Sequence, residues 1–354
     1  METVEKLKKL GFDPSMISPE ADLGERELAR VITEHKQLYR VKTASHEYFA
    51  KVTGKQMRLA TAREDYPAVG DFVAIEILNN DQAAIRELLP RKNAISKMKG
   101  NERKIIAANV DVAFIVESVN RDYNLNRLER YCALCLQEKI QPVVILNKID
   151  LISSWDLESK IDEIKNRLTG VEVISTSISE PSDLDKLKAS IQAGLTYCFL
   201  GSSGVGKSSI INKLIGKDVI KTGEIGEHAE RGKHTTTHRE MFFLENGGIL
   251  IDNPGMREVG LADFERGVEA VFDDITTLAQ KCKFADCAHI SEPGCAVLEA
   301  LAAGGLDQDQ YENYLVIKKE VDHFEMSEQE KRDKDRKFGK FVKKSLKRME
   351  EFEK

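Results

Sequence analysis

Residues 201–208 read GSSGVGKS, which fits the pattern G-x-x-x-x-G-K-[ST]. In this pattern glycines let backbone N–H groups turn toward phosphate oxygens, the lysine reaches the β- and γ-phosphates, and the last hydroxyl ligates Mg²⁺. The segment lies between the strand-like LTYCFL and the helix-like SSIINKLIG, which is the context that the pattern requires. It predicts a phosphate-binding loop, with Lys207 catalytic and Ser208 on magnesium, made of Gly201, Ser202, Ser203, Gly204, Val205, Gly206, Lys207, Ser208 and Ser209.

A second polar segment, Asn147-Lys148-Ile149-Asp150, follows the strand-like PVVIL. An aspartate at the carboxyl end of a strand can accept hydrogen bonds from N1–H and the exocyclic amine of guanine, which adenine does not offer. Leaving such a buried carboxylate unpaired costs on the order of a charged hydrogen bond, so adenine nucleotides should be rejected. Alone, these four residues are as compatible with an ordinary loop. Beside the phosphate loop they predict guanine binding by Asn147, Lys148 and Asp150.

Three further segments complete the expected site. Ser175 and Thr176 end the strand-like VEVIS and are expected to present backbone N–H groups to guanine O6. Asp252 and Gly255, in DNPG, offer a carboxylate to Mg²⁺ and an N–H to the γ-phosphate. The polar stretch 226–240 holds three threonines, of which one is expected to ligate Mg²⁺ when GTP is bound. The sequence does not distinguish Thr235, Thr236 and Thr237, and Thr236 is taken as the catalytic and magnesium-binding prediction.

The order of these segments is unusual. In GTPases the phosphate loop ordinarily comes first, followed by the switch threonine, D-x-x-G, N-K-x-D and the serine loop. Here NKID and Ser-Thr precede the phosphate loop, and the threonines and DNPG follow it. The domain therefore looks circularly permuted, a change that a fold tolerates when its original termini lie close together at the surface.

A cysteine–histidine cluster follows the nucleotide segments: Cys282, Cys287, His289 and Cys295 lie within fourteen residues. Three thiols and one imidazole suit tetrahedral Zn²⁺ and leave no open position for chemistry, which predicts a structural zinc site. The alternative is a set of buried free thiols. For Cys132 and Cys135, which share a helical face with leucines, burial in the core is the preferred interpretation.

Composition limits the class of protein. At 354 residues the chain is long enough for two or three domains, and 41% hydrophobic and 32% charged residues are typical of a globular protein. No apolar run approaches the ~20 residues that span a bilayer, and METVEKLKKLGF lacks the apolar centre of a signal peptide. We therefore expect a cytoplasmic protein without membrane contact, in which six cysteines do not form a disulfide framework.

The charge distribution is uneven. The formal net charge is −6, but residues 331–348 carry ten basic and two acidic side chains. Taken alone, such a run is a solvated helix face. It indicates an RNA-binding tail if the rest of the chain points to RNA.

The elements that must position these residues fall into three segments. Residues 27–97 alternate apolar and polar positions in short runs, which predicts a small β-barrel or sandwich. Residues 98–275 alternate buried-strand patterns with helical patterns, which predicts an α/β domain with a mainly parallel sheet. Its expected strands are 111–119, 142–148, 171–176, 195–201, 241–245 and 248–255. The final segment, 276–354, combines the cysteine–histidine cluster with helical, charged sequence.

The chain resembles the RsgA family of circularly permuted GTPases, which act in maturation of the small ribosomal subunit. The resemblance covers nearly its whole length and rests on VGD at 69–71, PRKN at 90–93, AANVD at 107–111, NKID, GSSGVGKSS, GKHTTT, DNPG and the cysteine–histidine cluster. It implies a multi-domain protein with an N-terminal all-β OB-fold, a central permuted α/β GTPase domain and a C-terminal α-helical zinc-binding domain. The corresponding boundaries are an extension at 1–26, then 27–97, 98–275 and 276–354.

The same resemblance implies GTP hydrolysis to GDP and phosphate, stimulated by the small (30S) ribosomal subunit and its 16S rRNA during late maturation. We expect a monomer with one structural Zn²⁺ and with Mg²⁺ bound alongside GTP. An alternative is a GTP-regulated RNA-binding module in which hydrolysis is incidental. A third hypothesis, a P-loop kinase or ATPase, conflicts with NKID and Ser-Thr.

Two positions depart from common patterns. Asn253 stands where the family more often has threonine, and we expect this side chain to face solvent. Met256 stands where many GTPases carry a water-positioning glutamine, and its side chain cannot orient water by hydrogen bonding. The resemblance points instead to His234 as the catalytic residue, although the residues alone favour an ordinary loop histidine.

Overall fold

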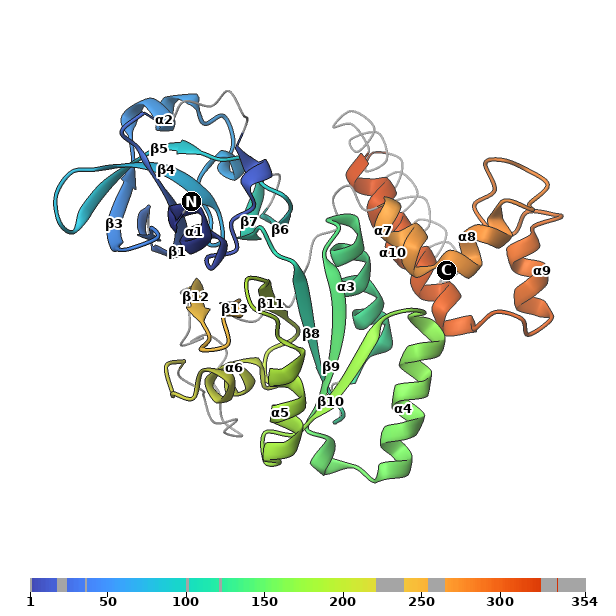
Figure 1. The fold of residues 1–354 in the computed structure, drawn as a ribbon. Coiled ribbons are helices and arrows are strands. Elements are labelled where there is room, and N and C mark those ends of the chain that lie inside the picture. Colours follow the sequence, from blue (N-terminus) through green and yellow to red (C-terminus); the bar gives the residue numbers. More distant parts are fainter. Residues whose placement is uncertain are drawn as a thin grey trace, which may run out of the picture. The chain divides into compact units, whose positions relative to one another are not determined.

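The structure, a computed structural model, describes residues 2–17, 24–35, 37–99, 102–120, 123–220, 239–253, 265–325 and 336 (Figure 1). The chain divides into two compact units, one of residues 1–260 and 269–271 and the other of residues 261–268 and 272–354. Each unit is described separately below. Across the described segments, no helix is long and apolar enough to cross a membrane.

An all-β barrel opens the first unit. Its strands are β1 (Glu27–His35), β2 (Leu38–Lys42), β3 (Glu47–Val52), β4 (Phe72–Ile77) and β5 (Gln82–Leu88). They pair in the order β1-β2-β3-β5-β4, and β4 returns to β1, which closes the barrel. Only the β3–β5 pair is parallel. This five-stranded closure is the arrangement of an OB-fold.

The barrel core follows from alternation along its strands. One side chain in two points inward, and these form a buried cluster that includes Val31, Tyr39, Val73, Ile75 and Ile85. Two short helical segments lie in the connection between β3 and β4: α2 (Gly54–Leu59) and the 3-10 turn η2 (Arg63–Asp65). A hairpin of β6 (Ala94–Lys99) and β7 (Glu102–Ala108) follows the barrel.

The residues before the barrel pack on it. They form α1 (Glu2–Lys8) and η1 (Pro14–Met16), and Phe12 meets Phe72 edge to face with 5.1 Å between ring centroids. The fully buried Arg30 donates hydrogen bonds to the carbonyl oxygens of Leu10 and Gly70, and its guanidinium lies over the Phe72 ring. The N-terminal segment is therefore tied to the barrel through both apolar contacts and a buried cation.

A mainly parallel sheet forms the α/β part of the first unit. Its strands are β8 (Val112–Ser118), β9 (Gln141–Asn147), β10 (Glu172–Thr176), β11 (Thr196–Leu200), β12 (Arg239–Phe243) and β13 (Ile249–Asp252). They lie in the order β10-β9-β8-β11-β13-β12, and all pairs are parallel except β12–β13. Each expected strand of this domain is present, so the predicted α/β sheet is confirmed.

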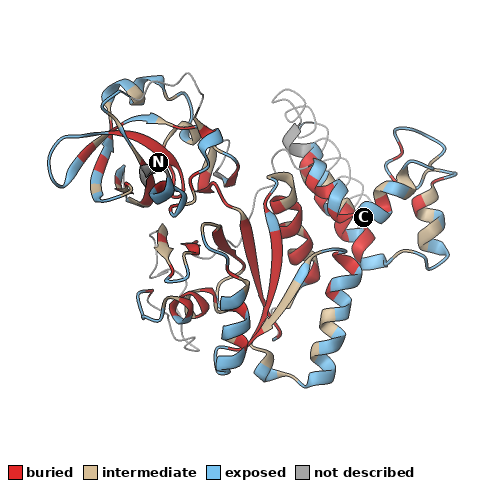
Figure 2. Cartoon of the chain, in the orientation of Figure 1, coloured by how far each residue is buried: buried red, intermediate tan, exposed pale blue. Residues whose placement is uncertain are grey.

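Helices cover both faces of this sheet, and its strands β8, β9, β11 and β13 are buried along most of their length (Figure 2). The helices are α3 (Leu125–Gln137), α4 (Ser154–Arg167), α5 (Pro181–Ser190) and α6 (Lys207–Ile215), with a 3-10 turn η3 (Ile149–Leu151) after β9. Side chains of α5 and α6 pack with Phe114, Tyr197 and Phe199 in one core. Cys132 and Cys135 of α3 are fully buried, so the prediction that they are core residues is confirmed.

One contact joins the two sheets. The last strand of the α/β sheet, β12, pairs antiparallel with β1 of the barrel, with Thr33 opposite Glu240 and Glu34 opposite Arg239. As a result, the described strands of barrel and α/β part form one continuous eleven-stranded sheet. β12 also pairs with β13, so it lies between the barrel and the strand that carries Asp252.

Helices form much of the described part of the second unit. They are most of α7 (Glu265–Val271), then α8 (Asp273–Ala279), α9 (Ala296–Ala302) and α10 (Gln308–Glu325). Phe272 and Tyr314 pack edge to face at 5.5 Å and anchor α10 against the start of α8. The basic run 331–348, apart from Arg336, lies outside the described residues.

Candidate functional site

The predicted phosphate loop connects β11 to α6 and requires its glycines. Gly201, Gly204 and Gly206 have φ of 135°, 87° and 103°, values that side-chain-bearing residues rarely adopt. A Cβ on Gly201 would lie 2.3 Å from the Val116 carbonyl oxygen. Gly206 caps α6, whose first residue is Lys207, so the free N–H groups of this helix end face the loop. The loop therefore has the backbone geometry of an anion cradle.

Lys207 folds back over this loop. Its Nζ donates to the carbonyl oxygens of Gly201 and Ser202 at 2.8 and 2.6 Å, and the side chain is buried. Burial lowers the pKa of Lys207 to about 8, although Asp252 and Glu117 act in the opposite direction. A phosphate in the cradle would give this ammonium a charged partner, which is a stronger acceptor than the two carbonyls.

The NKID segment lies directly against the phosphate loop, although 54 positions separate Asn147 from Gly201. Asn147 Nδ2 donates to the Val205 carbonyl at 2.8 Å, and Lys148 Nζ donates to the Gly204 carbonyl at 2.8 Å. A Cβ on Gly206 would approach Asn147 Nδ2 to 2.3 Å. Two segments that the permuted order separates are thus hydrogen-bonded into one site.

Asp150 is held by a residue that the sequence reasoning missed. Ser177 Oγ donates to Asp150 Oδ1 at 2.6 Å, which fixes the carboxylate at the end of β9. Asp150 itself is exposed, whereas the argument from sequence treated it as buried. A bound base would have to cover it before an unpaired carboxylate became costly. The signal for Ser177 was its place directly after Ser175-Thr176, at the carboxyl end of the adjacent parallel strand.

Ser175 and Thr176 lie at the end of β10, paired in parallel with Leu146 and Asn147 of β9. Asn147 Oδ1 and Thr176 Oγ1 are both buried and have no hydrogen-bond partner among the described residues. Such orphaned polar atoms are costly unless a ligand or water satisfies them. The two atoms therefore leave hydrogen-bonding capacity for a ligand or water at this end of the sheet.

Asp252 ends β13 and is buried, and its Oδ1 has no partner within the described residues. Burial raises the pKa of Asp252 to about 6, while the nearby Lys207 acts in the opposite direction. Binding of a divalent cation would offset the free-energy cost of burying this charged carboxylate. Asp252 therefore fits a magnesium ligand. Ser208, half-buried at the start of α6, is the hydroxyl predicted to share that ion.

Asn253 does not face solvent, so that expectation is wrong. Its side chain is 1% exposed, and Nδ2 donates to the Cys198 Sγ at 2.8 Å. The amide turns inward because β13 and β11 are neighbouring parallel strands, and Cys198 pairs with Ile251, two residues before Asn253. The Asn253 Oδ1 is buried without a partner among the described residues.

Several predicted residues lie outside the described residues. These are His234, the three threonines Thr235, Thr236 and Thr237, and Gly255 and Met256. They fall in two stretches that the structure does not describe, residues 221–238 and residues 254–264. The roles assigned to these residues therefore stay predictions.

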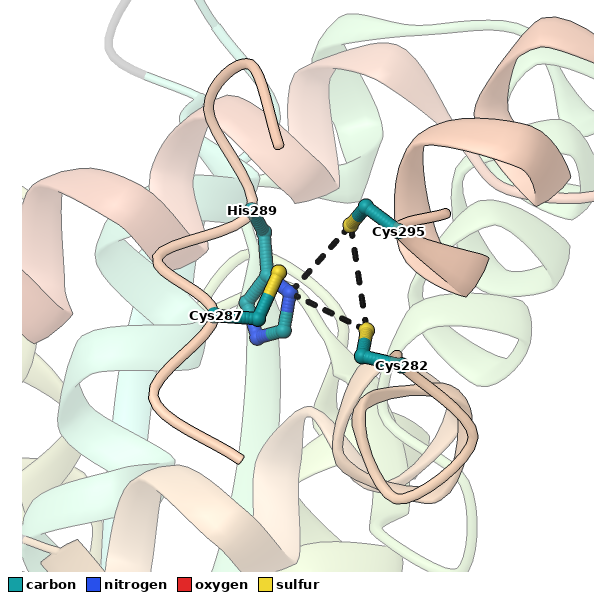
Figure 3. A group of neighbouring side chains, drawn as sticks. All are labelled: Cys282, Cys287, His289 and Cys295. Carbon is teal, nitrogen blue, oxygen red and sulfur yellow. Dashed lines mark hydrogen bonds between the residues drawn. The ribbon is translucent and has the colours of Figure 1, made fainter. Parts of the chain in front are cut away.

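The cysteine–histidine cluster is brought together as predicted (Figure 3). The ligand atoms of Cys282, Cys287, His289 and Cys295 all lie within 4.8 Å of one another. His289 Nδ1 is 3.6 Å from Cys282 Sγ and 3.5 Å from Cys295 Sγ, and the two sulfurs are 3.8 Å apart. A tetrahedron with Zn–S bonds of about 2.3 Å has edges of about 3.8 Å, so the spacing fits one metal ion.

The backbone around the cluster is fixed by a left-handed residue and by several hydrogen bonds. His289 adopts a left-handed φ of 60°, and its carbonyl accepts a hydrogen bond from the Tyr311 hydroxyl at 2.6 Å. The Glu292 carboxylate accepts hydrogen bonds from the backbone N–H groups of Ala288, Ile290 and Ser291, which closes the turn between His289 and Cys295. Cys295 then caps α9. These contacts position His289 and Cys295.

Comparisons with known proteins show which family this chain belongs to. The RsgA GTPase family matches residues 88–262. A Bacteroides thetaiotaomicron protein named small ribosomal subunit biogenesis GTPase RsgA 1 is 42% identical over 328 residues, covering 91% of this chain and 91% of its own. The chain belongs to the RsgA family. Another RsgA protein, from Methanosarcina acetivorans, is 40% identical over 291 residues and covers 80% of this chain and 77% of its own.

Solved structures extend the RsgA assignment to the fold. The crystal structure of YjeQ from Thermotoga maritima is 26% identical with a TM-score of 0.62, covering 82% of this chain and 97% of that one. YloQ, described as a circularly permuted GTPase, is 24% identical with a TM-score of 0.61, covering 88% and 100%. The predicted fold class is confirmed: an OB-like barrel, a permuted GTPase domain of the RsgA type and a C-terminal helical part with a metal-ligand cluster.

Proposed function

We propose that this protein is a GTPase that binds the small (30S) ribosomal subunit and hydrolyses GTP when the subunit stimulates it, during late maturation of that subunit. The observation that carries the proposal is the contact of NKID with the phosphate loop, through Asn147 on Val205 and Lys148 on Gly204. The residues proposed to recognise guanine and the loop proposed to bind the phosphates therefore lie in one site. The names of the RsgA relatives support the choice of partner.

Each group of residues has a proposed task. The phosphate loop and Lys207 hold the β- and γ-phosphates, and Ser208 and Asp252 fit the Mg²⁺ that accompanies GTP. Asp150, held by Ser177, recognises the guanine, with Asn147 and Thr176 on the same side of the base. Gly255 donates to the γ-phosphate and Thr236 completes the magnesium shell, both from segments outside the described residues. When bound, Mg²⁺ would neutralise charge on the phosphates.

Hydrolysis needs a side chain that orients the attacking water by hydrogen bonding, and the Met256 side chain cannot do this. We assign this task to His234, which lies in the segment 221–238 between the phosphate loop and β12. Slow turnover in isolation and stimulation by the subunit follow if the partner must position His234 first. His234→Ala should leave GTP binding nearly intact and remove the stimulation in a single-turnover assay on 30S particles.

The remaining parts supply binding to the particle. The OB-like barrel at 27–97 and the basic run at 331–348 would contact 16S rRNA through phosphates and stacking, which makes binding fall steeply with added salt. The cluster of Cys282, Cys287, His289 and Cys295 holds a structural Zn²⁺, one per chain. We place the GTPase domain at 98–275 and the zinc domain at 276–354, in a cytoplasmic monomer.

Co-sedimentation with purified 30S particles under GTP, GDP and a non-hydrolysable GTP analogue tests the proposal, together with turnover measured with and without particles. Tight binding with GTP and the analogue, weaker binding with GDP, and stimulated turnover are expected. If the affinity for particles is the same with GTP, GDP and the analogue, and particles do not stimulate turnover, an RNA-binding module in which hydrolysis is incidental is favoured instead. Equal turnover of ATP would exclude both.

A further inference from the structure

A row of polar side chains crosses the sheet from the barrel to the strand that leads into the phosphate loop. Its members, called the polar row below, are Glu34 on β1, Arg239 on β12, Asn253 directly after β13, and Cys198 on β11. Glu34 stands opposite Arg239 in the β1–β12 ladder. In the antiparallel β12–β13 ladder Glu240 stands opposite Asp252, so the next pair in the same register is Arg239 and Asn253. Arg239 therefore has one neighbour in the barrel and one beside Asp252.

The members of the polar row share one face of the sheet. Residues that stand opposite each other in a ladder point to the same face, and successive residues along a strand alternate between faces. Arg239 and Asn253 thus point to one face. Cys198 points to it too, because it is opposite Ile251, two residues before Asn253. Directly opposite side chains have Cβ atoms about 5 Å apart, a distance that an arginine side chain spans easily.

Two of the three links along the polar row are present in this structure. A terminal nitrogen of Arg239 lies 3.7 Å from a Glu34 carboxylate oxygen, and the two side chains are only 20% and 21% exposed. At the other end, Asn253 Nδ2 donates to Cys198 Sγ. The middle link is open: Arg239 Nε and Asn253 Oδ1 are both buried and have no hydrogen-bond partner in the part of the chain that the structure describes. One of these atoms is a donor and the other is an acceptor.

The electrostatics of the polar row agree with this placement. Burial raises the pKa of the Cys198 thiol to about 12, whereas the Asn253 amide and the Arg239 guanidinium act in the opposite direction, so both side chains are close to the same sulfur. Burial lowers the pKa of Arg239, and Glu34 opposes that change. A buried donor and a buried acceptor without partners are both costly, and a hydrogen bond between Arg239 and Asn253 removes both costs at once.

We propose that Arg239 is a positioning residue for GTP, and that its Nε donates a hydrogen bond to Asn253 Oδ1 when GTP and Mg²⁺ occupy the nucleotide site. This inference rests on the function proposed above. Asn253 lies between Asp252, which fits a magnesium ligand, and Gly255, which is predicted to donate to the γ-phosphate. Contacts on both sides would fix the chain at Asn253. GDP has no γ-phosphate to bind Gly255, so the hydrogen bond is specific to the GTP complex.

The completed polar row would connect the barrel with the nucleotide site. Glu34 belongs to the barrel strand β1, so its ion pair with Arg239 orients the guanidinium from that side. The planar guanidinium has several donors in a fixed arrangement, which lets a terminal nitrogen face Glu34 while Nε faces Asn253. A lysine at this position would keep the charge opposite Glu34 but has no counterpart of Nε. The substitution Arg239→Lys therefore separates the proposed hydrogen bond from the ion pair.

Competition binding in the full-length protein tests the inference, with Mg²⁺ and without ribosomal particles. A fluorescent guanine nucleotide is displaced by a non-hydrolysable GTP analogue or by GDP, and the ratio of the two affinities is the readout. The variants are Arg239→Lys, Asn253→Ala and the double substitution. The matched control is Arg40→Lys, because Arg40 lies 3.9 Å from Glu240, the next residue of β12, and its side chain is 42% exposed. Circular dichroism melting checks folding, and if Asn253→Ala does not fold, Arg239→Lys alone carries the test.

Arg239→Lys should weaken binding of the GTP analogue about fivefold and change the affinity for GDP less than about twofold. Asn253→Ala should lower the affinity ratio by a similar factor, and the double variant should lower it no further, because both substitutions remove the same hydrogen bond. The control should leave the ratio unchanged. A ratio that is unaltered in Arg239→Lys, or losses that multiply in the double variant, overturn the inference while the proposed function stands. An unsubstituted protein that binds neither nucleotide contradicts the proposed function and this inference together.

Discussion

The Asn253 side-chain amide donates a hydrogen bond to the fully buried Cys198 thiol, with 2.8 Å between Nδ2 and Sγ. This contact links the residue after Asp252 to β11, the strand that leads into the phosphate loop. Both partners are buried, so removing the acceptor leaves an unsatisfied amide N–H in the interior. The contact thus connects the end of β13, where Asp252 lies, with the strand that precedes the predicted phosphate loop.

A double-mutant cycle measures that coupling. Asn253→Ala and Cys198→Ala should each destabilise the GTPase domain, and the double variant should be less destabilised than the sum by about 1 kcal/mol. Hydrogen exchange of the β11 and β13 amides is the readout, because the chain has more than one unit and whole-protein melting is not two-state. Strict additivity of the two substitutions would mean that this hydrogen bond contributes nothing.

Gly206→Ala should abolish tight binding of both GTP and GDP. The new Cβ would lie 2.3 Å from Asn147 Nδ2 at a φ of 103°, so the phosphate loop and NKID cannot keep their contact. Gly216→Ala is the matched control, since Gly216 caps the other end of α6 at a φ of 74° with nothing within 4 Å. Titration with a fluorescent guanine nucleotide measures the affinity of both variants. Comparable losses of affinity would attribute the effect to backbone strain alone.

Asp150→Asn should reduce the preference for guanine over adenine nucleotides, because the amide cannot accept both base hydrogen bonds. Ser177→Ala should have a smaller effect in the same direction, of severalfold, since it frees the carboxylate without removing it. Competition binding with GDP and ADP measures both ratios. A ratio unaltered in Asp150→Asn would mean that another residue reads the base.

Magnesium binding should depend on pH through Asp252. Its pKa is raised to about 6 by burial, and the cation requires the ionised carboxylate. Affinity for Mg²⁺ should therefore rise with pH through about 6 and level off about one pH unit above it, and at pH 5 it should be about tenfold weaker than at neutral pH. Calorimetric titration of the GDP complex tests this, with Asp252→Asn as the reference that keeps only the nucleotide's own titration.

Metal analysis of the C-terminal cluster should give one zinc per chain. Cys295→Ser should lose the metal and destabilise the second unit, because the binding energy of such a site is also folding energy. Cys132→Ser is the control, since Cys132 is buried in the first unit and should leave the zinc content unchanged. Full zinc content in Cys295→Ser would contradict the proposed ligand set.

The sequence by itself determined the fold class and most of the site. Glycines at 201, 204 and 206, the lysine and serine after them, and NKID after a buried strand are local patterns whose physical roles depend little on distant residues. The strands of the α/β sheet were equally predictable, because runs of apolar residues between turn residues report burial directly. The four residues of the candidate metal site were recognisable for a similar reason, since they lie within fourteen residues of one another.

Tertiary structure decided what depends on neighbours far away in the chain. The inward turn of Asn253 follows from Cys198 on the adjacent strand, 55 residues earlier, whereas the sequence alone led us to expect this amide in solvent. Ser177 supports Asp150 because β9 and β10 are parallel neighbours that end at the same edge. The pairing of β1 with β12 joins segments about two hundred positions apart. No local pattern encodes such contacts, because hydrogen-bond partners and cavities are properties of packed surfaces rather than of single segments.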